Sequence, residues 1–313
     1  MSPRWPLSRR AFLLACAASV AACGFRGGPS GRIRLAAGDP GGMYLAFAEL
    51  LAKRVQDRYP ETEVQVVPTE GTVENLALLR SADVDVGLAL ADVAERDRAI
   101  GPIAAAPVAI ARVYENYLQV IVRDFTGAQQ ISDLRGQRVS FGAARSGGAA
   151  TSAVLFDAAG LTHDVRTTWY RLREALSQLA DGGIDALAWS GGVPTPAITD
   201  LDSQLPLRIL DIGALAAPMS RIASYPYAVW RVPAGGYVPP GIRSIGVPNL
   251  LLCRQGVSTA LVAALVNVIA TESPHLVPPY VRGLQYLDAP SMIQTGAIPL
   301  HAGAVAAYRG LHG

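Results

Sequence analysis

The stretch from Val64 to Leu79, V-Q-V-V-P-T-E-G-T-V-E-N-L-A-L-L, places a short apolar strand directly before a polar turn and the start of a helix. Three of its first four residues are valines, and Pro68 bounds them, which is typical of a buried strand in an α/β sheet. Thr69 to Thr72 supply turn and N-cap residues, and the leucines that follow begin the apolar face of a helix. This order predicts a strand-turn-helix corner at which a ligand binds.

The helix that begins after Gly71 offers a site for an anion. Its first backbone amides have no partner within the helix, and the helix dipole adds a partial positive charge there. A carboxylate is therefore the expected ligand. The alternative is a capped helix without a ligand, because such corners occur in every α/β protein.

Two more corners of the same kind occur in the chain. Residues 33–37 form a predicted strand, 38–42 a glycine-rich loop, and 43–54 a helix with apolar residues at helical spacing. Residues 138–141, 142–148 and 149–159 repeat the order strand, loop and helix. Three loops are thus expected to deliver helix N-termini.

An internal repeat indicates two similar lobes. The corner at 33–54 is matched by the one at 138–159, and Val84-Asp85-Val86 is matched by Ile184-Asp185-Ala186, about a hundred residues later. Strand and helix alternate throughout, which predicts a mostly parallel sheet covered on both faces. We therefore expect an α/β chain of two lobes, with the loops at the strand ends facing a shared cleft. The predicted first lobe comprises residues 32–117 plus 248–313, and the second comprises 118–247.

Length and charge narrow the class of protein. A chain of 313 residues suits two lobes better than one core. Only 17% of the residues are charged, and the net charge is +2. Three of the 27 basic residues lie in the first 22 positions, which leaves 24 basic against 25 acidic residues. The chain after residue 22 is therefore close to neutral, which argues against a nucleic acid as partner.

The first 22 residues are interpreted as an export signal. Ser8-Arg9-Arg10-Ala11-Phe12 resembles a twin-arginine motif, and the apolar run from Ala11 to Ala22 is too short to span a bilayer. The run ends Val20-Ala21-Ala22-Cys23, which resembles the lipobox of bacterial lipoproteins and predicts acylation of Cys23. An ordinary signal peptide cut after Ala22, or an uncleaved anchor, are the alternatives. Residues 23–31 are rich in glycine and are expected to tether a lipid-anchored periplasmic body.

The remaining cysteine and the histidines predict neither a disulfide nor a metal site. Cys253 alone is left in the mature body, within an apolar run, and is expected to be a buried small hydrophobe. The four histidines have no ligand spacing such as H-x-x-x-H. No metal or cofactor is therefore expected.

Over residues 32–310 the chain resembles a TAXI-type solute-binding subunit of a TRAP transporter. The most specific part of this resemblance is the run Thr69–Leu76. Weaker parts are Gly41-Gly42 with Tyr44, Ser146-Gly147, and Gly191-Gly192 with Pro194.

The resemblance implies a type II-like periplasmic-binding-protein fold that closes on a small carboxylate, such as an amino acid or a 2-oxoacid. It also implies that the solute passes to a TRAP membrane permease component, without chemistry. A ligand-sensing lipoprotein that docks on a membrane receptor is the alternative. An enzyme has little support, because no set of nucleophile, base and orienting residue is recognisable.

Three positions depart from the family pattern. Met43 stands where the family commonly has Thr, and Gly148 and Ala149 replace the usual Thr and Arg. These departures favour an acid less polar than glutamate, with Arg145 as a substitute cation.

The predicted cleft residues come from the matching loops, with Thr72 and Asn75 expected as hydroxyl and amide partners of the ligand. The ligand-binding set is Gly42, Met43, Tyr44, Thr69, Thr72, Val73, Asn75, Arg145, Ser146, Gly147, Gly148, Gly191 and Gly192.

Overall fold

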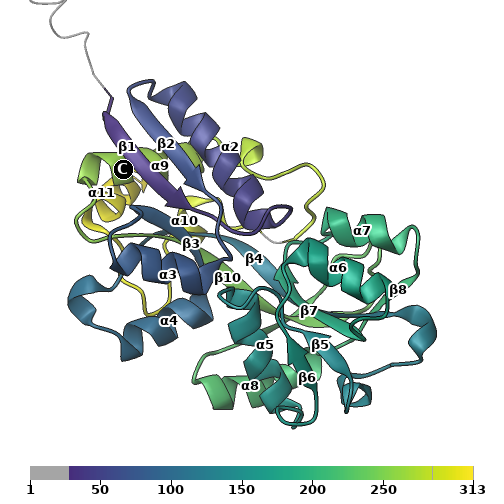
Figure 1. Ribbon diagram of the computed structural model, residues 1–313. Helices are drawn as coiled ribbons and strands as arrows, with labels where there is room; N and C mark the ends of the chain where they lie inside the picture. The colour runs from purple at the N-terminus through teal and green to yellow at the C-terminus, as the bar shows by residue number, and fades with distance from the viewer. Residues whose placement is uncertain (1–27, 284, 313) are drawn as a thin grey trace, which may run out of the picture.

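In a computed structural model, residues 28–312 except 284 are described, and they form two α/β lobes that share one sheet (Figure 1). The strand order is β2-β1-β3-β10-β4-β7-β5-β6, with β8 paired to β4 and β9 to β10. The export signal, Cys23 and most of the tether lie outside the described residues. The ten strands are β1 (Gly31–Ala36), β2 (Thr62–Val67), β3 (Val86–Leu90), β4 (Val108–Arg123), β5 (Arg138–Ser140), β6 (Arg166–Thr168), β7 (Ala186–Gly191), β8 (Leu207–Ile209), β9 (Ala228–Arg231) and β10 (Arg243–Cys253).

The helices lie on both faces of the sheet (Figure 1). Those of the first lobe are α2 (Met43–Arg58), α3 (Thr72–Arg80), α4 (Ala91–Ile100), α9 (Thr259–Thr271), α10 (Ala289–Met292) and α11 (Ala302–His312). Those of the second lobe are α5 (Gly147–Ala158), α6 (Leu172–Ala180), α7 (Pro196–Asp202) and α8 (Ala216–Ala223). Short 3-10 turns occupy Ile103–Ala105, Asp124–Thr126, Ile131–Leu134, Gly213–Leu215 and Ser273–His275.

The internal repeat is visible in the strand order. The first lobe has β2-β1-β3 in parallel, and the second has β6-β5-β7 in parallel. Asp85 accepts a hydrogen bond from the Arg34 amide at 2.9 Å, and Asp185 accepts one from the Arg138 amide at 2.9 Å. These aspartates therefore join equivalent strands in the two lobes.

Two long strands, β4 and β10, run antiparallel to each other between the lobes (Figure 1). The C-terminal half of β10 pairs with β3 of the first lobe, and the C-terminal half of β4 pairs with β7 of the second. The predicted lobe boundaries, at 117/118 and 247/248, fall inside these two strands. The exact division into lobes stays a prediction.

Three apolar clusters pack against the sheet: one lies in the first lobe, one lies mainly in the second, and one contains residues of both lobes. In the first lobe the Phe47 ring packs against Tyr114 with centroids 5.3 Å apart. Cys253 is fully buried among the same residues, and burial raises the pKa of its thiol to about 12, so the thiol is uncharged. Helix α9 packs in this core as well. Among the described residues, no helix combines the length and hydropathy that a membrane crossing requires.

Candidate functional site

A cavity lies where the strand ends of the two lobes meet. The space open to the centres of water molecules is about 50 Å³, so the cavity admits a small ligand. Its lining consists of Gly38, Asp39, Gly42, Met43, Tyr44, Glu70, Gly71, Thr72, Leu90, Asn116, Phe141, Gly142, Ala143, Ser146, Gly147, Gly148, Ala188, Trp189, Ser190 and Gly191.

The structure brings eight of the predicted ligand-binding residues into this lining, and all three strand-turn-helix corners contribute. These eight are Gly42, Met43, Tyr44, Thr72, Ser146, Gly147, Gly148 and Gly191. The other five, Thr69, Val73, Asn75, Arg145 and Gly192, are not among the lining residues.

Helix α5 presents unpaired backbone amides to the cavity. Ser146 is its N-cap, and the Ser146 hydroxyl accepts a hydrogen bond from the Ala149 amide at 3.0 Å. Gly147 and Gly148 line the cavity, and their amides donate to no other group among the described residues. Two free donors at the positive end of a helix dipole can bind an anion.

The N-termini of α3 and α5 approach each other closely. Gly71 has φ +123°, a conformation that favours glycine, and a Cβ there would lie 3.5 Å from the Ser146 Cα. A Cβ on Gly147 would lie 2.4 Å from the Thr72 Oγ1, closer than atoms can pack. Glycine at 147 is therefore required for this contact between the lobes.

Tyr44 and Thr72 form a buried pair of hydroxyls in the first lobe. The Tyr44 hydroxyl lies 3.2 Å from the Thr72 Oγ1, which also accepts a hydrogen bond from the Leu90 amide at 3.0 Å. Burial raises the pKa of the Tyr44 phenol, so the hydroxyl stays protonated and can act as a donor. The pair can therefore hydrogen-bond a ligand oxygen.

Asn75 and Thr69 are placed behind the cavity, contrary to the role expected for Asn75 as an amide partner of the ligand. The Asn75 Nδ2 donates to the carbonyl oxygens of Ala37 at 2.7 Å and Leu88 at 2.8 Å. Its Oδ1 accepts from the Thr69 hydroxyl at 2.7 Å, and the side chain is 0% exposed. Since the whole amide group is engaged within the protein, Asn75 ties α3 to the residue after β1 and to the middle of β3.

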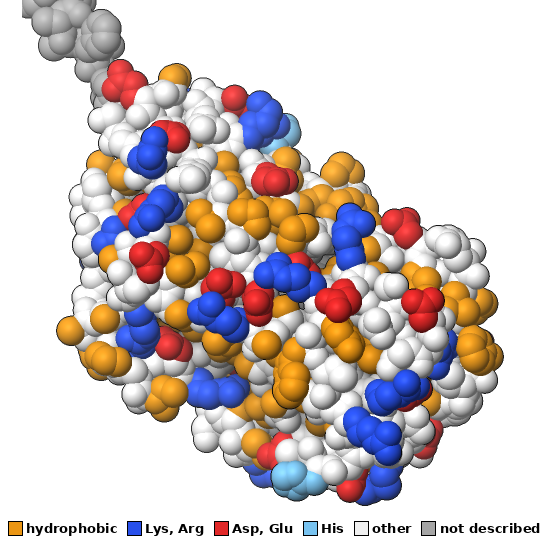
Figure 2. Space-filling view, viewed as in Figure 1, with side chains coloured by type: hydrophobic (Ala, Val, Ile, Leu, Met, Phe, Trp, Pro, Cys, Tyr) orange, Lys and Arg blue, Asp and Glu red, His pale blue; other side chains and the backbone are white. Residues whose placement is uncertain are grey.

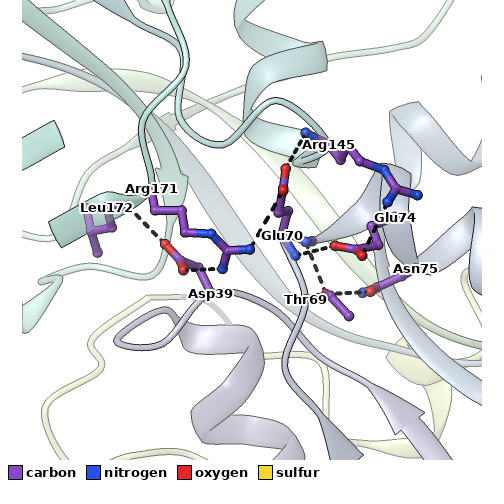
Figure 3. A network of polar contacts seen from close by, with 9 residues as sticks. Asp39, Thr69, Glu70, Glu74, Asn75, Arg145, Arg171 and Leu172 are labelled. Atoms are coloured by element: carbon purple, nitrogen blue, oxygen red, sulfur yellow. Dashed lines mark hydrogen bonds and ion pairs between the residues drawn. The ribbon is translucent and has the colours of Figure 1, made fainter. Parts of the chain in front are cut away.

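Arg145 is likewise bound to the first lobe and not to the cavity. Its carbonyl accepts from the Glu74 amide at 3.1 Å, and its own amide donates to the Glu70 carboxylate at 2.8 Å. Its guanidinium lies 3.3 Å from the Glu74 carboxylate. The substitute cation expected here is therefore paired with an acid (Figure 3).

A reciprocal contact runs in the other direction across the cleft. The Asp39 carboxylate accepts from the Leu172 amide at the start of α6, at 2.9 Å, and from the Arg171 guanidinium at 3.1 Å. Arg171 also lies 3.7 Å from the Glu70 carboxylate (Figure 3). Each lobe thus supplies a hydrogen-bond acceptor for a backbone amide in the first turn of a helix of the other lobe. We call Asp39, Glu70, Glu74, Arg145, Arg171 and Leu172 the cross-cleft network.

The two arginines of the cross-cleft network lie at the surface, where the side chains of Arg145 and Arg171 are 50% and 49% exposed. Figure 2 shows acidic and basic side chains side by side in a band across the middle of this face, between the lobes. Asp39 and Glu70 belong to both the network and the cavity lining, and no lysine, arginine or histidine belongs to the lining. The lining thus carries two acidic side chains and no basic one.

A buried aspartate joins the lobes at a second place. Asp92, on α4, accepts hydrogen bonds from the Thr151 hydroxyl at 2.8 Å and the Tyr227 hydroxyl at 2.7 Å, both in the second lobe. Burial raises the pKa of this carboxyl. Contacts between the lobes are therefore not confined to the cleft mouth.

Two predicted residues lie beside the cavity. Val73 is 36% exposed on the surface of α3. A Cβ on Gly192 would lie 3.7 Å from the Met43 side chain, so this glycine packs behind Met43.

The prediction from sequence missed lining residues on strands and strand ends. Asn116 lies within β4, Trp189 and Ser190 lie within β7, and Phe141 follows β5. The one signal for Asn116 was a polar residue inside an apolar run. Ser190 lies directly before the predicted Gly191.

The sheet order, the long crossing strands and a cavity at the facing strand ends define the two-lobe fold of periplasmic solute-binding proteins. The predicted fold class is therefore confirmed. Residues 35–310 match the model of the NMT1-like family. The chain belongs to this family.

Solved structures with the same fold are distant in sequence. Tv2483 bound to L-arginine has a TM-score of 0.54 and 13% identity, over 82% of this chain and 93% of that one. PhnD1 from Prochlorococcus marinus in complex with methylphosphonate has a TM-score of 0.51 and 13% identity, over 77% of this chain and 84% of that one. The periplasmic binding protein BugD has a TM-score of 0.52 and 14% identity, over 76% and 81%. At these identities the likeness concerns the fold alone.

Proposed function

We propose that this protein is an extracytoplasmic solute-binding protein that captures a small organic acid and delivers it to a TRAP-type membrane permease. The observation that carries the proposal is the cavity between the lobes, where the amides of Gly147 and Gly148 are the free donors of α5. A carboxylate there gains about 0.3–1 kcal/mol from the helix dipole, and up to about 2 when partly buried. The solved structures of the same fold hold L-arginine and methylphosphonate, which are also small molecules.

Binding without chemistry is the activity that these side chains support. The lining holds no histidine, lysine or cysteine. The Ser146 hydroxyl accepts from a backbone amide within its own helix, and no base among the described residues hydrogen-bonds it. A nucleophile needs an adjacent base to be activated. The proposal therefore assigns no catalytic residue.

A pair of substitutions at Gly148 tests the anion site. Proline is tolerated in the first turn of a helix but lacks the N–H group, so Gly148→Pro removes one of the two free donors. A Cβ at this position would lie 3.4 Å from the Ser190 Cβ, an ordinary contact, so Gly148→Ala is the matched control. We expect Gly148→Pro to bind the acid about tenfold to a hundredfold more weakly than Gly148→Ala, because a hydrogen bond to a charged group contributes about 1.5–3 kcal/mol.

The ligand is identified first by a thermal-shift screen and calorimetry on wild type with small carboxylates, neutral sugars and organic cations. We expect only carboxylates to stabilise the protein. Stabilisation by sugars or cations alone contradicts the proposal, as does equal affinity of the two Gly148 variants.

Lipid anchoring is a separate part of the proposal and concerns residues outside those described. If Cys23 is acylated, several acyl chains hold the protein firmly at the membrane, and Cys23→Ser releases it. Fractionation of cells that express each form is the measurement. Equal amounts of both forms in the soluble periplasmic fraction would contradict the anchor.

A further inference from the structure

A second, narrower space adjoins the cavity at two of its lining residues. Met43 and Trp189 border both spaces, and the other walls of the narrow one include Gly192 and Thr195. The narrow space offers about 10 Å³ to the centres of water molecules, compared with about 50 Å³ in the cavity. We call it the neck.

The neck adjoins a wider groove at the surface, and Gly41, Pro196 and Tyr280 border both. The groove offers about 220 Å³ to the centres of water molecules. Its walls include residues of α2 in the first lobe and of α6 and α7 in the second. Space for a larger ligand therefore exists beyond the neck, and Met43 and Trp189 separate the cavity from it.

Trp189 is the fixed part of this partition. Its Nε1 donates to the Thr195 hydroxyl at 3.2 Å, and that hydroxyl donates to the Gly192 carbonyl at 2.8 Å. A Cβ on Gly191 would lie 2.4 Å from the Trp189 Nε1, so the indole lies directly against the glycine backbone. The far edge of the ring reaches the first lobe, where a Cβ on Gly42 would lie 3.8 Å from the Trp189 Cη2. The ring thus crosses the cleft in an orientation held by hydrogen bonds.

Met43 is the adaptable part of the partition. It is 7% exposed, and a Cβ on Gly192 would lie 3.7 Å from the Met43 Cβ and Cγ and 3.9 Å from its Sδ. A methionine side chain is unbranched and flexible, so it fills an irregular gap well. Met43 belongs to the first lobe, whereas Gly192 and Trp189 belong to the second. The partition is therefore complete only when the lobes are in contact.

The part of the lining that a ligand chain would meet is largely apolar. A carboxylate bound by the amides of Gly147 and Gly148 leaves the rest of the ligand against the other walls of the cavity. Their apolar side chains are Met43, Leu90, Phe141, Ala143, Ala188 and Trp189. Contact with these side chains favours a hydrocarbon chain.

We propose that Met43 determines specificity by limiting the chain length of the acid. The solute class is then a short monocarboxylate whose apolar chain ends at Met43 and Trp189. This inference rests on the proposed function, because it takes the carboxylate to bind at α5. A longer chain has to displace the Met43 side chain from its packing against Gly192, and this lowers its affinity.

Calorimetry with straight-chain acids on wild type is the first measurement, with propionate, butyrate, hexanoate and octanoate as probes. We expect hexanoate and octanoate to bind about fivefold to a hundredfold more weakly than the better of the two short acids, because extra methylenes forced into a packed space are unfavourable. Octanoate that binds wild type as tightly as propionate would overturn the proposal.

Met43→Ala is the second measurement. This substitution removes the Cγ, Sδ and Cε atoms and so makes room for up to about three methylenes, the difference between propionate and hexanoate. We expect the affinity for hexanoate relative to propionate to exceed the wild-type ratio by about fourfold for each methylene accommodated, or about sixtyfold for three.

Leu45→Ala is the matched control. It also removes three heavy atoms from the first turns of α2, but Leu45 borders the groove and neither the cavity nor the neck. We expect the wild-type ratio in this variant. An equal rise in both variants, or an unchanged ratio in a folded Met43→Ala, contradicts the role of Met43.

The remaining outcomes separate this inference from the proposed function. If Met43→Ala does not fold, the chain-length series on wild type decides alone. If none of the four acids binds wild type but another carboxylate does, the apolar chain is wrong and the carboxylate site stands. If no carboxylate binds wild type, the proposed function fails as well.

Discussion

Gly147→Ala is predicted to prevent close contact of the two lobes without unfolding either. The new Cβ would lie 2.4 Å from the Thr72 Oγ1 and 2.8 Å from the Leu90 Cδ1. Since contacting heavy atoms need about 3.5 Å, α5 has to move away from α3 by about 1 Å. Alanine has a higher helix propensity than glycine, so the substitution does not destabilise α5 itself. The loss of free energy is therefore confined to the contact between the lobes.

The magnitude follows from two hydrogen bonds next to this contact. A shift of about 1 Å takes the Glu74 amide out of reach of the Arg145 carbonyl, now at 3.1 Å, and the Arg145 amide out of reach of the Glu70 carboxylate, now at 2.8 Å. The first contributes about 0.5–1.5 kcal/mol and the second about 1.5–3 kcal/mol. If the ligand binds the closed form, their loss weakens its affinity about thirtyfold to two-thousandfold.

Calorimetry and small-angle scattering measure the two consequences. We expect weak binding and a radius of gyration that no longer decreases with ligand, while the melting temperature stays within a few degrees of wild type. Gly310→Ala is the control, since it makes the same change in helix α11, where a Cβ would meet nothing within 4 Å. Wild-type affinity and wild-type contraction in Gly147→Ala would refute the steric argument.

Three further variants test other parts of the structure. Asp39→Ala removes the acceptor for the Leu172 amide, so calorimetry should show ligand affinity about threefold to thirtyfold lower, as for a lost N-cap of about 0.5–2 kcal/mol; an unchanged affinity would mean that the cross-cleft network does not contribute to closure. Asn75→Ala leaves the carbonyls of Ala37 and Leu88 unpaired and should lower the free energy of unfolding by about 2–4 kcal/mol in urea titrations; a loss of affinity with wild-type stability would instead restore Asn75 as a ligand contact. Hydrogen bonds from Arg138 lower the pKa of Asp185, so its contribution to stability is present above the unfolded pKa of about 3.9 and is lost as pH falls through the folded pKa; Asp185→Asn should be less stable than wild type at pH 7 and should lose less stability on acidification, and parallel pH profiles would contradict this.

The fold could be predicted from the sequence because its signals are local. Apolar β-branched runs, glycine-rich loops and helical spacing repeat in each lobe, so the predicted strands at 33–37, 64–67 and 138–141 lie within two residues of β1, β2 and β5, whereas the three-residue strand β6 is not predicted. The two crossing strands, β4 and β10, are less evident from the sequence. In β4 the apolar pattern is interrupted by Arg112, Glu115 and Asn116, whose burial depends on partners distant in sequence, such as Tyr286, which donates to Glu115 at 2.7 Å. In β10, Pro248 divides one strand into two apparent runs.

The candidate site could be predicted only in part, for the same physical reason. Loop glycines and N-cap residues show from sequence where a helix begins, and most of them line the cavity. Whether a polar side chain faces the ligand or the protein depends on tertiary contacts. The side-chain amide of Asn75 makes all its hydrogen bonds within the protein, whereas the Asn116 Oδ1 has no partner among the described residues. The sequence around the two residues does not distinguish these cases.

The pairing of β4 with β10 determines where the molecule can bend. Between Pro248 and Leu250 the register shifts, so that Val113 and Tyr114 of β4 lie opposite the single residue Asn249. The Asn249 side chain donates to the Tyr114 carbonyl at 3.2 Å and so satisfies a group that the ladder omits. If the lobes open and close, as the family resemblance implies, both crossing strands flex together, and the strain is smallest where the ladder is already interrupted and the twist is increased. The hinge then lies at interruptions of strand register, this one and a second between Leu251 and Leu252, and its stiffness is set by hydrogen bonds and not by loop length.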